Sequence, residues 1–125
     1  MQFDIHMIGF DEMLAAAPSR PGAYALRQHD GLRFGRFRGD SDIVYIGCAV
    51  GPGGMKRRIQ TYLAGSATGT TERVIAASAH YASFGEFEVA WVECADAEAA
   101  RSLERGLLRR YELHHGEFPP LNRHG

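Results

Sequence analysis

The chain has 125 residues, of which 45% are hydrophobic and 23% charged, a composition typical of a folded domain and not of a disordered one. Its longest apolar stretches fall far short of the roughly 20 residues that a membrane span needs, and its acidic N-terminal region lacks a signal-peptide pattern. With only Cys48 and Cys94, the chain has neither a disulfide scaffold nor a CxxC metal motif. We therefore expect a single cytoplasmic domain over residues 1–125, with no membrane association.

The charge of the chain is small but unevenly distributed. The formal net charge is −1, which excludes a strong chain-wide attraction to nucleic acid. Residues 20–62, however, hold eight basic and three acidic side chains. Thirteen of the 14 basic residues are arginine, whose planar fork of donors suits phosphate contact. A high genomic GC content explains the arginine bias equally well.

The N-terminal third predicts a short helix and a strand pair. Residues 11–17 begin with two acids and stop before Pro18, as a short helix does. Residues 22–27 alternate as a strand does. An Asp30-Gly31 turn leads to residues 32–37, which we expect to continue as a ribbon until the polar residues 39–42 break it.

The middle of the chain predicts a buried strand followed by helices. Residues 43–48 are β-branched, aromatic and nearly all apolar, as expected of a central strand covered on both faces. Residues 51–54 are rich in glycine and form a loop. Residues 55–64 have apolar side chains on one helical side, and a second helix is predicted over residues 72–81.

The C-terminal part predicts a third strand and a long helix. Phe87, Val89 and Trp91 share one face of the strand, which we expect to face the core. The helix runs from residue 97 to 113. Asp96 precedes it as an N-cap, and Gly116 ends it. These elements predict an α/β class fold, a small α+β sandwich with one sheet of about three strands.

Glu104 breaks the pattern of the long helix. At about 100° per residue, it is the only charged residue inside the apolar arc. That arc is formed by Ala100, Leu103, Leu107, Leu108 and Tyr111. A carboxylate in this position loses hydration, so a metal ion, a cation or a set of donors should compensate it. The structural alternative is an ion pair with Arg110 or with an arginine from elsewhere.

Arg58 and Tyr62 form an i, i+4 pair on the border of the apolar side of the 55–64 helix. A guanidinium in this position is half sheltered and still reaches solvent. It suits an active site, although a solvated helix flank explains the same pattern.

Five ordered segments resemble the GIY-YIG nuclease family, which includes the endonuclease domain of the bacterial nucleotide-excision incision subunit. The segments are Pro21-Gly22-Ala23-Tyr24, Val44-Tyr45-Ile46-Gly47, Met55 to Leu63, Leu103 to Tyr111, and Pro119-Pro120-Leu121-Asn122. The resemblance covers residues 18–122 and implies a small central three-stranded antiparallel sheet flanked by helices. It also implies a metal-dependent endonuclease that cuts DNA. The matching site residues are Tyr24, Tyr45, Arg58, Tyr62, Glu104 and Asn122.

The resemblance implies a role for each group. Glu104 would hold one Mg²⁺, with Mn²⁺ as a substitute, because Mg²⁺ keeps most of its waters and uses few carboxylates. Arg58 would offer bidentate donors to the phosphate. Either Tyr24 or Tyr45 would orient or deprotonate the attacking water, and the sequence does not decide between them. Asn122 would brace the site by hydrogen bonding.

This chain also departs from the family pattern. The interval between the two tyrosines is about twice the family's commonest length, with residues 32–41 added, and Cys48 stands where a polar residue often follows Tyr-Ile-Gly. The added ribbon is either a flap that contacts substrate or an inert solvated ribbon. Candidate nucleic-acid contacts are Arg33, Arg36, Arg38, Lys56 and Arg57.

The sequence favours an endonuclease acting on DNA, and two alternatives stay open. The first is a nucleic-acid-binding module that keeps the fold without useful activity, which the acidic pI and the altered loops favour. The second is the same site acting on RNA or on a special DNA structure. Selectivity would then come from the chain's own loops, from a homodimer or from a further DNA-targeting protein.

Overall fold

The computed structural model describes residues 8–9, 19–27, 33–64 and 88–122. The elements are β1 (Ile8–Gly9), β2 (Gly22–Arg27), β3 (Phe34–Gly35), β4 (Asp40–Ser41), β5 (Ile43–Ala49), α2 (Gly54–Ala64), β6 (Glu88–Glu93) and α4 (Ala97–His115). The helices predicted over residues 11–17 and 72–81 lie outside the described residues.

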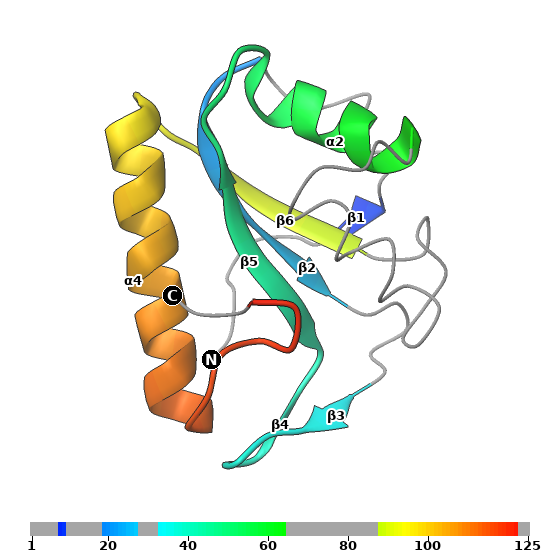
Figure 1. Ribbon diagram of the computed structural model, residues 1–125, viewed down its shortest axis with the longest axis vertical. Coiled ribbons are helices and arrows are strands. Elements are labelled where there is room, and N and C mark those ends of the chain that lie inside the picture. The colour runs from blue at the N-terminus through cyan, green and yellow to red at the C-terminus, as the bar shows by residue number, and fades with distance from the viewer. Residues whose placement is uncertain (1–7, 10–18, 28–32, 65–87, 123–125) are drawn as a thin grey trace.

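The main sheet is antiparallel, with the strand order β1-β6-β2-β5. Its three longer strands are the predicted three-stranded antiparallel sheet, and the two-residue β1 extends one edge. Figure 1 shows α4 running alongside the sheet on one side and α2 near the end of β5 on the other. This arrangement confirms the predicted α+β class. No helix among the described residues is both long and apolar enough to cross a membrane.

Both faces of the central strands are covered, as the composition of residues 43–48 predicts. Along β5, Val44 and Ile46 are fully buried, and Tyr45 on the other face is 7% exposed. On the α4 side, Ile46 packs in a cluster with Leu108 and Tyr111 of the helix. In β6, Val89 is buried as predicted, whereas Trp91 is only partly buried.

The ribbon predicted for residues 32–37 has a different partner from the expected one. Phe34 pairs with Ser41, and Gly35 pairs with Asp40, so the polar segment 39–42 contains the strand β4 (Asp40–Ser41) instead of ending the ribbon. The physical reason is that β2 already pairs with β5 along one edge and with β6 along the other. No edge of β2 is free, and Phe34–Gly35 instead form a two-stranded sheet with Asp40–Ser41.

Both ends of α4 are capped as the sequence predicts. The Oδ1 atom of Asp96 accepts a hydrogen bond from the backbone N–H of Ala99 at 2.8 Å. Gly116 takes the left-handed conformation with φ of 80°, and its N–H donates to the carbonyl of Glu112. The helix continues two residues beyond the predicted end. Arg38 donates to the carbonyl of Leu113 at 2.7 Å, which satisfies one of the acceptors that every helix end leaves free.

Candidate active site

The C-terminal segment covers the free edge of β5. The N–H of Leu121 donates to the carbonyl of Val44 at 2.9 Å. The side chain of Asn122 accepts from the N–H of Ile46 at 3.0 Å and donates to its carbonyl at 2.9 Å. Asn122 therefore pairs with Ile46 as a residue of a neighbouring strand would, and it satisfies an edge that would otherwise be open.

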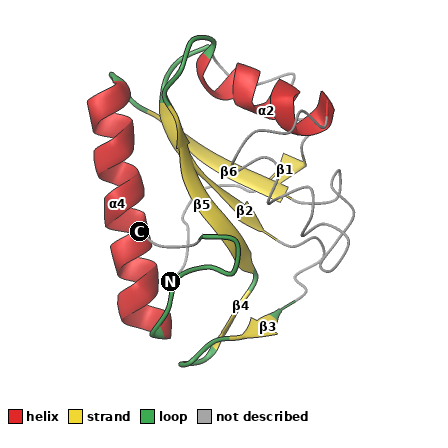
Figure 2. Ribbon diagram, viewed as in Figure 1, coloured by secondary structure: helices red, strands yellow, loops and turns green. Residues whose placement is uncertain are grey.

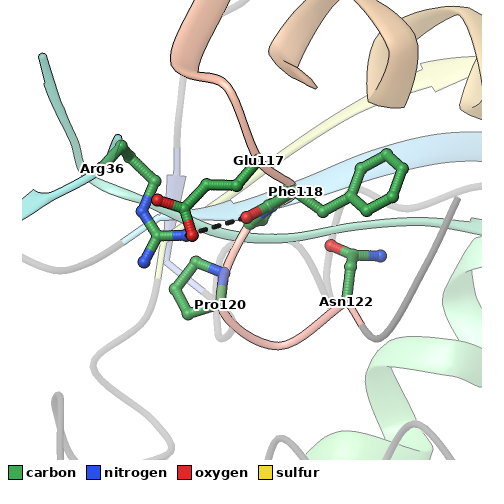
Figure 3. A pocket seen from close by; sticks show the side chains of 6 residues that line it. Arg36, Glu117, Phe118, Pro120 and Asn122 are labelled. Atoms are coloured by element: carbon green, nitrogen blue, oxygen red, sulfur yellow. Dashed lines mark hydrogen bonds and ion pairs between the residues drawn. The ribbon is translucent and has the colours of Figure 1, made fainter. Parts of the chain in front are cut away.

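Figure 3 shows the surroundings of Asn122, which lines an open pocket of about 440 Å³ together with Phe118 and Pro120. Arg36 and Glu117 meet at another part of this pocket, where their side chains approach to 3.0 Å. Figure 2 shows the loop after α4 folding back toward β5. Because both polar groups of the Asn122 amide are bonded to Ile46, its geometry is that of a bracing residue.

Tyr24 and Tyr45 lie next to each other around Gly47. Their ring centroids are 6.0 Å apart, and Tyr24 stands directly opposite Gly47 in the β2–β5 pair. A Cβ atom at residue 47 would lie 2.5 Å from Cε2 of Tyr45 and 3.0 Å from the hydroxyl of Tyr24. Only glycine leaves room for both rings, which gives the Tyr-Ile-Gly motif a packing reason in this chain.

Both tyrosines are buried. Tyr24 is 1% exposed and Tyr45 is 7% exposed. Side chains alternate along a strand, so Tyr45 and Gly47 face away from α4, while Ile46 and Cys48 face toward it. The structure thus brings the two tyrosines together on the sheet face opposite α4.

Glu104 of α4 lies beside Cys48 of β5, and both side chains are partly buried. Burial raises the pKa of the Glu104 carboxyl, while the hydrogen bond from the Cys48 thiol acts in the opposite direction. Burial also raises the pKa of Cys48, to about 11, and the neighbouring Glu104 charge adds to this effect. The thiol is therefore neutral near pH 7 and donates its hydrogen to the carboxylate.

The charges of three arginines act to lower the pKa of this carboxyl, but they do not outweigh the effect of burial, and the pKa stays above its ordinary value. They are Arg105, Arg101 and Arg58, in order of decreasing effect. Arg110, the ion-pair partner considered from the sequence, is exposed and is not among them. Arg58 belongs to α2, whereas Arg101 and Arg105 belong to α4. Positive charges from two different helices therefore act on the Glu104 carboxyl.

The predicted site residues therefore form two groups on opposite faces of the sheet, at the consecutive residues Gly47 and Cys48 of β5. One group is the tyrosine pair around Gly47, and the other is Glu104 with Cys48 and the charge of Arg58. Tyr62 falls within α2, but its side chain lies outside the described part of the structure. Sequence reasoning noted Cys48 only as a departure from the pattern, since no periodicity signals a contact between a strand and a distant helix.

Glu104 is the metal ligand predicted from the sequence, and the groups that act on it are the Cys48 thiol and three guanidiniums, none of which offers an oxygen ligand. Within the described residues, no three His, Cys, Asp or Glu side chains gather into a cluster that could hold a metal ion. This excludes a closed zinc site in that part of the chain, because such a site needs four protein ligands. Mg²⁺ is commonly held by one or two carboxylates, with water and substrate phosphate as the other ligands, so a site with Glu104 as its single carboxylate would be compatible with Mg²⁺ and poor for zinc.

The five basic residues predicted to contact nucleic acid lie in two separate places. Lys56 and Arg57 are exposed on α2, whereas Arg33, Arg36 and Arg38 belong to the β3–β4 ribbon at the other end of the molecule (Figure 1). The ribbon arginines also make internal bonds. Arg33 pairs with Asp40 at 2.8 Å, and Arg36 and Arg38 bind groups after and at the end of α4.

Comparison with known proteins supports the same fold. Among solved structures, the chain is similar to the GIY-YIG N-terminal endonuclease domain of UvrC from Thermotoga maritima, whose crystal structure contains its catalytic divalent cation, magnesium. The sequences are 20% identical, the TM-score is 0.56, and the match covers 90% of this chain and 94% of that one. This likeness shows a GIY-YIG-like fold. No protein-family model matches the chain, and no curated protein matches it either.

Proposed function

We propose that this chain is a divalent-metal-dependent endonuclease that hydrolyses DNA phosphodiester bonds near residues 47 and 48. The observation that carries the proposal is the Glu104 carboxylate, partly buried on α4 and surrounded by the charges of Arg58 and two further arginines. This carboxylate lies beside the Tyr-Ile-Gly strand, in a fold similar to an endonuclease domain that binds a catalytic magnesium ion.

Each proposed role follows from the chemistry of the side chain. Glu104 holds the Mg²⁺, which when bound neutralises charge on the phosphate and acidifies coordinated water. Arg58 supplies a permanent charge and paired donors to the phosphoryl oxygens as their charge increases in the transition state. Asn122 keeps β5 in place through the backbone of Ile46.

The role that we assign to Tyr24 and Tyr45 is to orient the attacking water. A phenol has a reference pKa of about 10, so it is a weak base at neutral pH and acts here mainly as a hydrogen-bonding group. Because Tyr24 and Tyr45 are buried, this role requires their face of the sheet to open when substrate binds.

A plasmid nicking assay tests the proposal with Mg²⁺, Mn²⁺ or EDTA. We expect metal-dependent nicking by the wild type and a loss of about 100-fold or more in Arg58→Ala and Glu104→Gln, as for the removal of one transition-state contact. Glu98→Gln makes the same change at an exposed position in the first turn of α4, so it should keep full activity. Nicking in EDTA, or equal nicking by all variants, would refute the assignment.

The second candidate is a nucleic-acid-binding module that lacks cleavage. The burial of Tyr24 and Tyr45 favours it, since the two residues are only 1% and 7% exposed and offer little surface to a substrate. Binding of DNA or RNA without metal-dependent cleavage of either would support this candidate. Cleavage of RNA alone would assign the site to RNA.

A further inference from the structure

The packing of α4 on β5 places Cys48 opposite Glu104. Ile46 of β5 lies in one hydrophobic cluster with Leu108 of α4. Figure 1 shows that α4 begins at the end of the sheet where β5 ends, so the two elements run in opposite directions. Cys48 follows Ile46 by two strand residues, or about 6.8 Å, and Glu104 precedes Leu108 by four helical residues, or about 6 Å. Because these two steps match, the register of the packing brings the thiol to the carboxylate.

The contact between these two side chains is polar and sheltered. Both Cys48 and Glu104 are partly buried, and the thiol donates a hydrogen bond to the carboxylate. The two oxygens of a carboxylate offer about four lone-pair positions between them. Glu104 can therefore accept the thiol hydrogen and still coordinate a cation, so the thiol and a metal ion do not compete for it.

The surface of α4 offers this carboxylate a second position. Arg101 precedes Glu104 by three residues and is exposed, and its positive charge acts on the carboxyl. Opposite charges at this helical spacing attract each other. A Glu104 side chain drawn toward Arg101 would turn out to solvent, away from β5. The hydrogen bond from Cys48 acts against this movement, because its donor belongs to the strand.

We infer that Cys48 is a positioning residue, whose thiol holds the Glu104 carboxylate toward β5 in the orientation that binds the divalent metal ion. This inference rests on the proposed function and adds a residue to the same site. Cys48 acts through Glu104 and touches neither the metal nor the substrate. Hydrogen bonds that orient a metal ligand in this way commonly change metal affinity or activity by about 10–100-fold when they are removed.

Mn²⁺ binding measured without DNA tests the inference separately from cleavage. Electron paramagnetic resonance follows the loss of the free Mn²⁺ signal and gives the Kd. We expect Cys48→Ala to raise this Kd by about tenfold, and Cys48→Ser, which restores a donor on a side chain of similar size to alanine, to bind nearly as tightly as the wild type. The control is Cys94→Ala, which should leave the Kd unchanged. Cys94 is also partly buried, but its thiol donates to the carbonyl of Val92 at 3.6 Å.

The plasmid nicking assay adds a measurement that a merely structural role would not affect. Cys48→Ala should need about tenfold more Mg²⁺ for half-maximal nicking and should reach the wild-type kcat at saturating Mg²⁺, since the same carboxylate then holds the metal. The inference is overturned if Cys48→Ala binds Mn²⁺ as tightly as the wild type does. It is also overturned if Cys48→Ser loses as much affinity as Cys48→Ala, because side-chain volume and not the donor would then be the cause.

Glu104→Gln separates this inference from the proposed function. Mn²⁺ binding that is lost in Glu104→Gln and unchanged in Cys48→Ala refutes the inference alone. Equal Mn²⁺ binding by the wild type and Glu104→Gln refutes both, since the carboxylate would then hold no metal. Mn²⁺ binding that depends on both residues, without nicking of DNA, supports the inference and refutes the proposed nuclease.

Discussion

Replacing Asn122 with alanine should destabilise the protein through the edge of β5. The change removes two hydrogen bonds, of 3.0 and 2.9 Å, to the backbone of Ile46. At a net value of about 0.5–1.5 kcal/mol each, their loss should lower the free energy of unfolding by about 1–3 kcal/mol. For a chain of this length, 1 kcal/mol corresponds to about 4 °C, so the thermal midpoint should fall by about 4–12 °C.

Thermal unfolding followed by circular dichroism measures this loss, and two further variants make the comparison specific. Asn122→Asp keeps an acceptor for the N–H of Ile46 but places a carboxylate oxygen against its carbonyl. It should therefore be at least as unstable as Asn122→Ala at pH 7 and recover as the pH falls toward 4 and the acid is protonated. Gln60→Ala removes an exposed amide from α2 and should change stability by less than about 0.5 kcal/mol.

Nicking activity separates bracing from direct chemistry at Asn122. Ile46 stands between Tyr45 and Gly47, so losing its edge partner should also reduce activity at temperatures where the variant is still folded. An Asn122→Ala protein with an unchanged thermal midpoint and no activity would refute the bracing role, because the amide would then act on the substrate itself.

Three more predictions concern Gly47 and Cys48 of β5 and Glu104 of α4. Gly47→Ala should lower the free energy of unfolding by about 1–3 kcal/mol, because the new Cβ meets the rings of Tyr45 and Tyr24. Chemical denaturation should show no comparable loss for the control Gly35→Ala, whose Cβ would meet no atom within 4 Å. Burial raises the pKa of Glu104, so its ionised form costs stability in the folded state above that pKa. Glu104→Gln should therefore have a higher thermal midpoint than the wild type at pH 8, and the difference should shrink as the pH falls from the raised pKa toward the ordinary pKa of a glutamate. A lower midpoint for Glu104→Gln at pH 8 would instead indicate a stabilising ion pair. With a pKa of about 11, Cys48 should react slowly with iodoacetamide at pH 8. Glu104→Gln removes the negative charge beside the thiol and should speed this reaction, which mass spectrometry of the alkylated peptide measures. Equal rates in both proteins would contradict the Cys48–Glu104 contact.

Local patterns in the sequence predict much of this fold. The apolar run of residues 43–48 and the capping residues Asp96 and Gly116 act within a few residues, and the structure confirms each of them. The position of Glu104 inside the apolar arc of α4 predicts its partial burial for the same reason. Helix and strand periods determine which side of an element a residue occupies.

Contacts between distant elements could not be predicted from such local patterns. The partner of β3 depends on which edges of β2 are occupied, and the contact between Cys48 and Glu104 depends on how α4 crosses β5. Neither follows from a repeat within one segment. For Asn122, the resemblance gave the position and the bracing role, but only the structure identifies the backbone of Ile46 as its partner.

The added residues between Tyr24 and Tyr45 do not disturb the strands that carry the site. Tyr24 still pairs with Gly47, because the part of the insertion that the structure describes folds as a separate ribbon, held by the end of α4 and outside the main sheet. The glycine-rich loop before α2 is also fixed, since the carbonyl of Arg20 accepts a hydrogen bond from Met55 and lies where a Cβ on Gly54 would be. An insertion anchored in this way adds a surface at the end of α4 without moving β2 or β5.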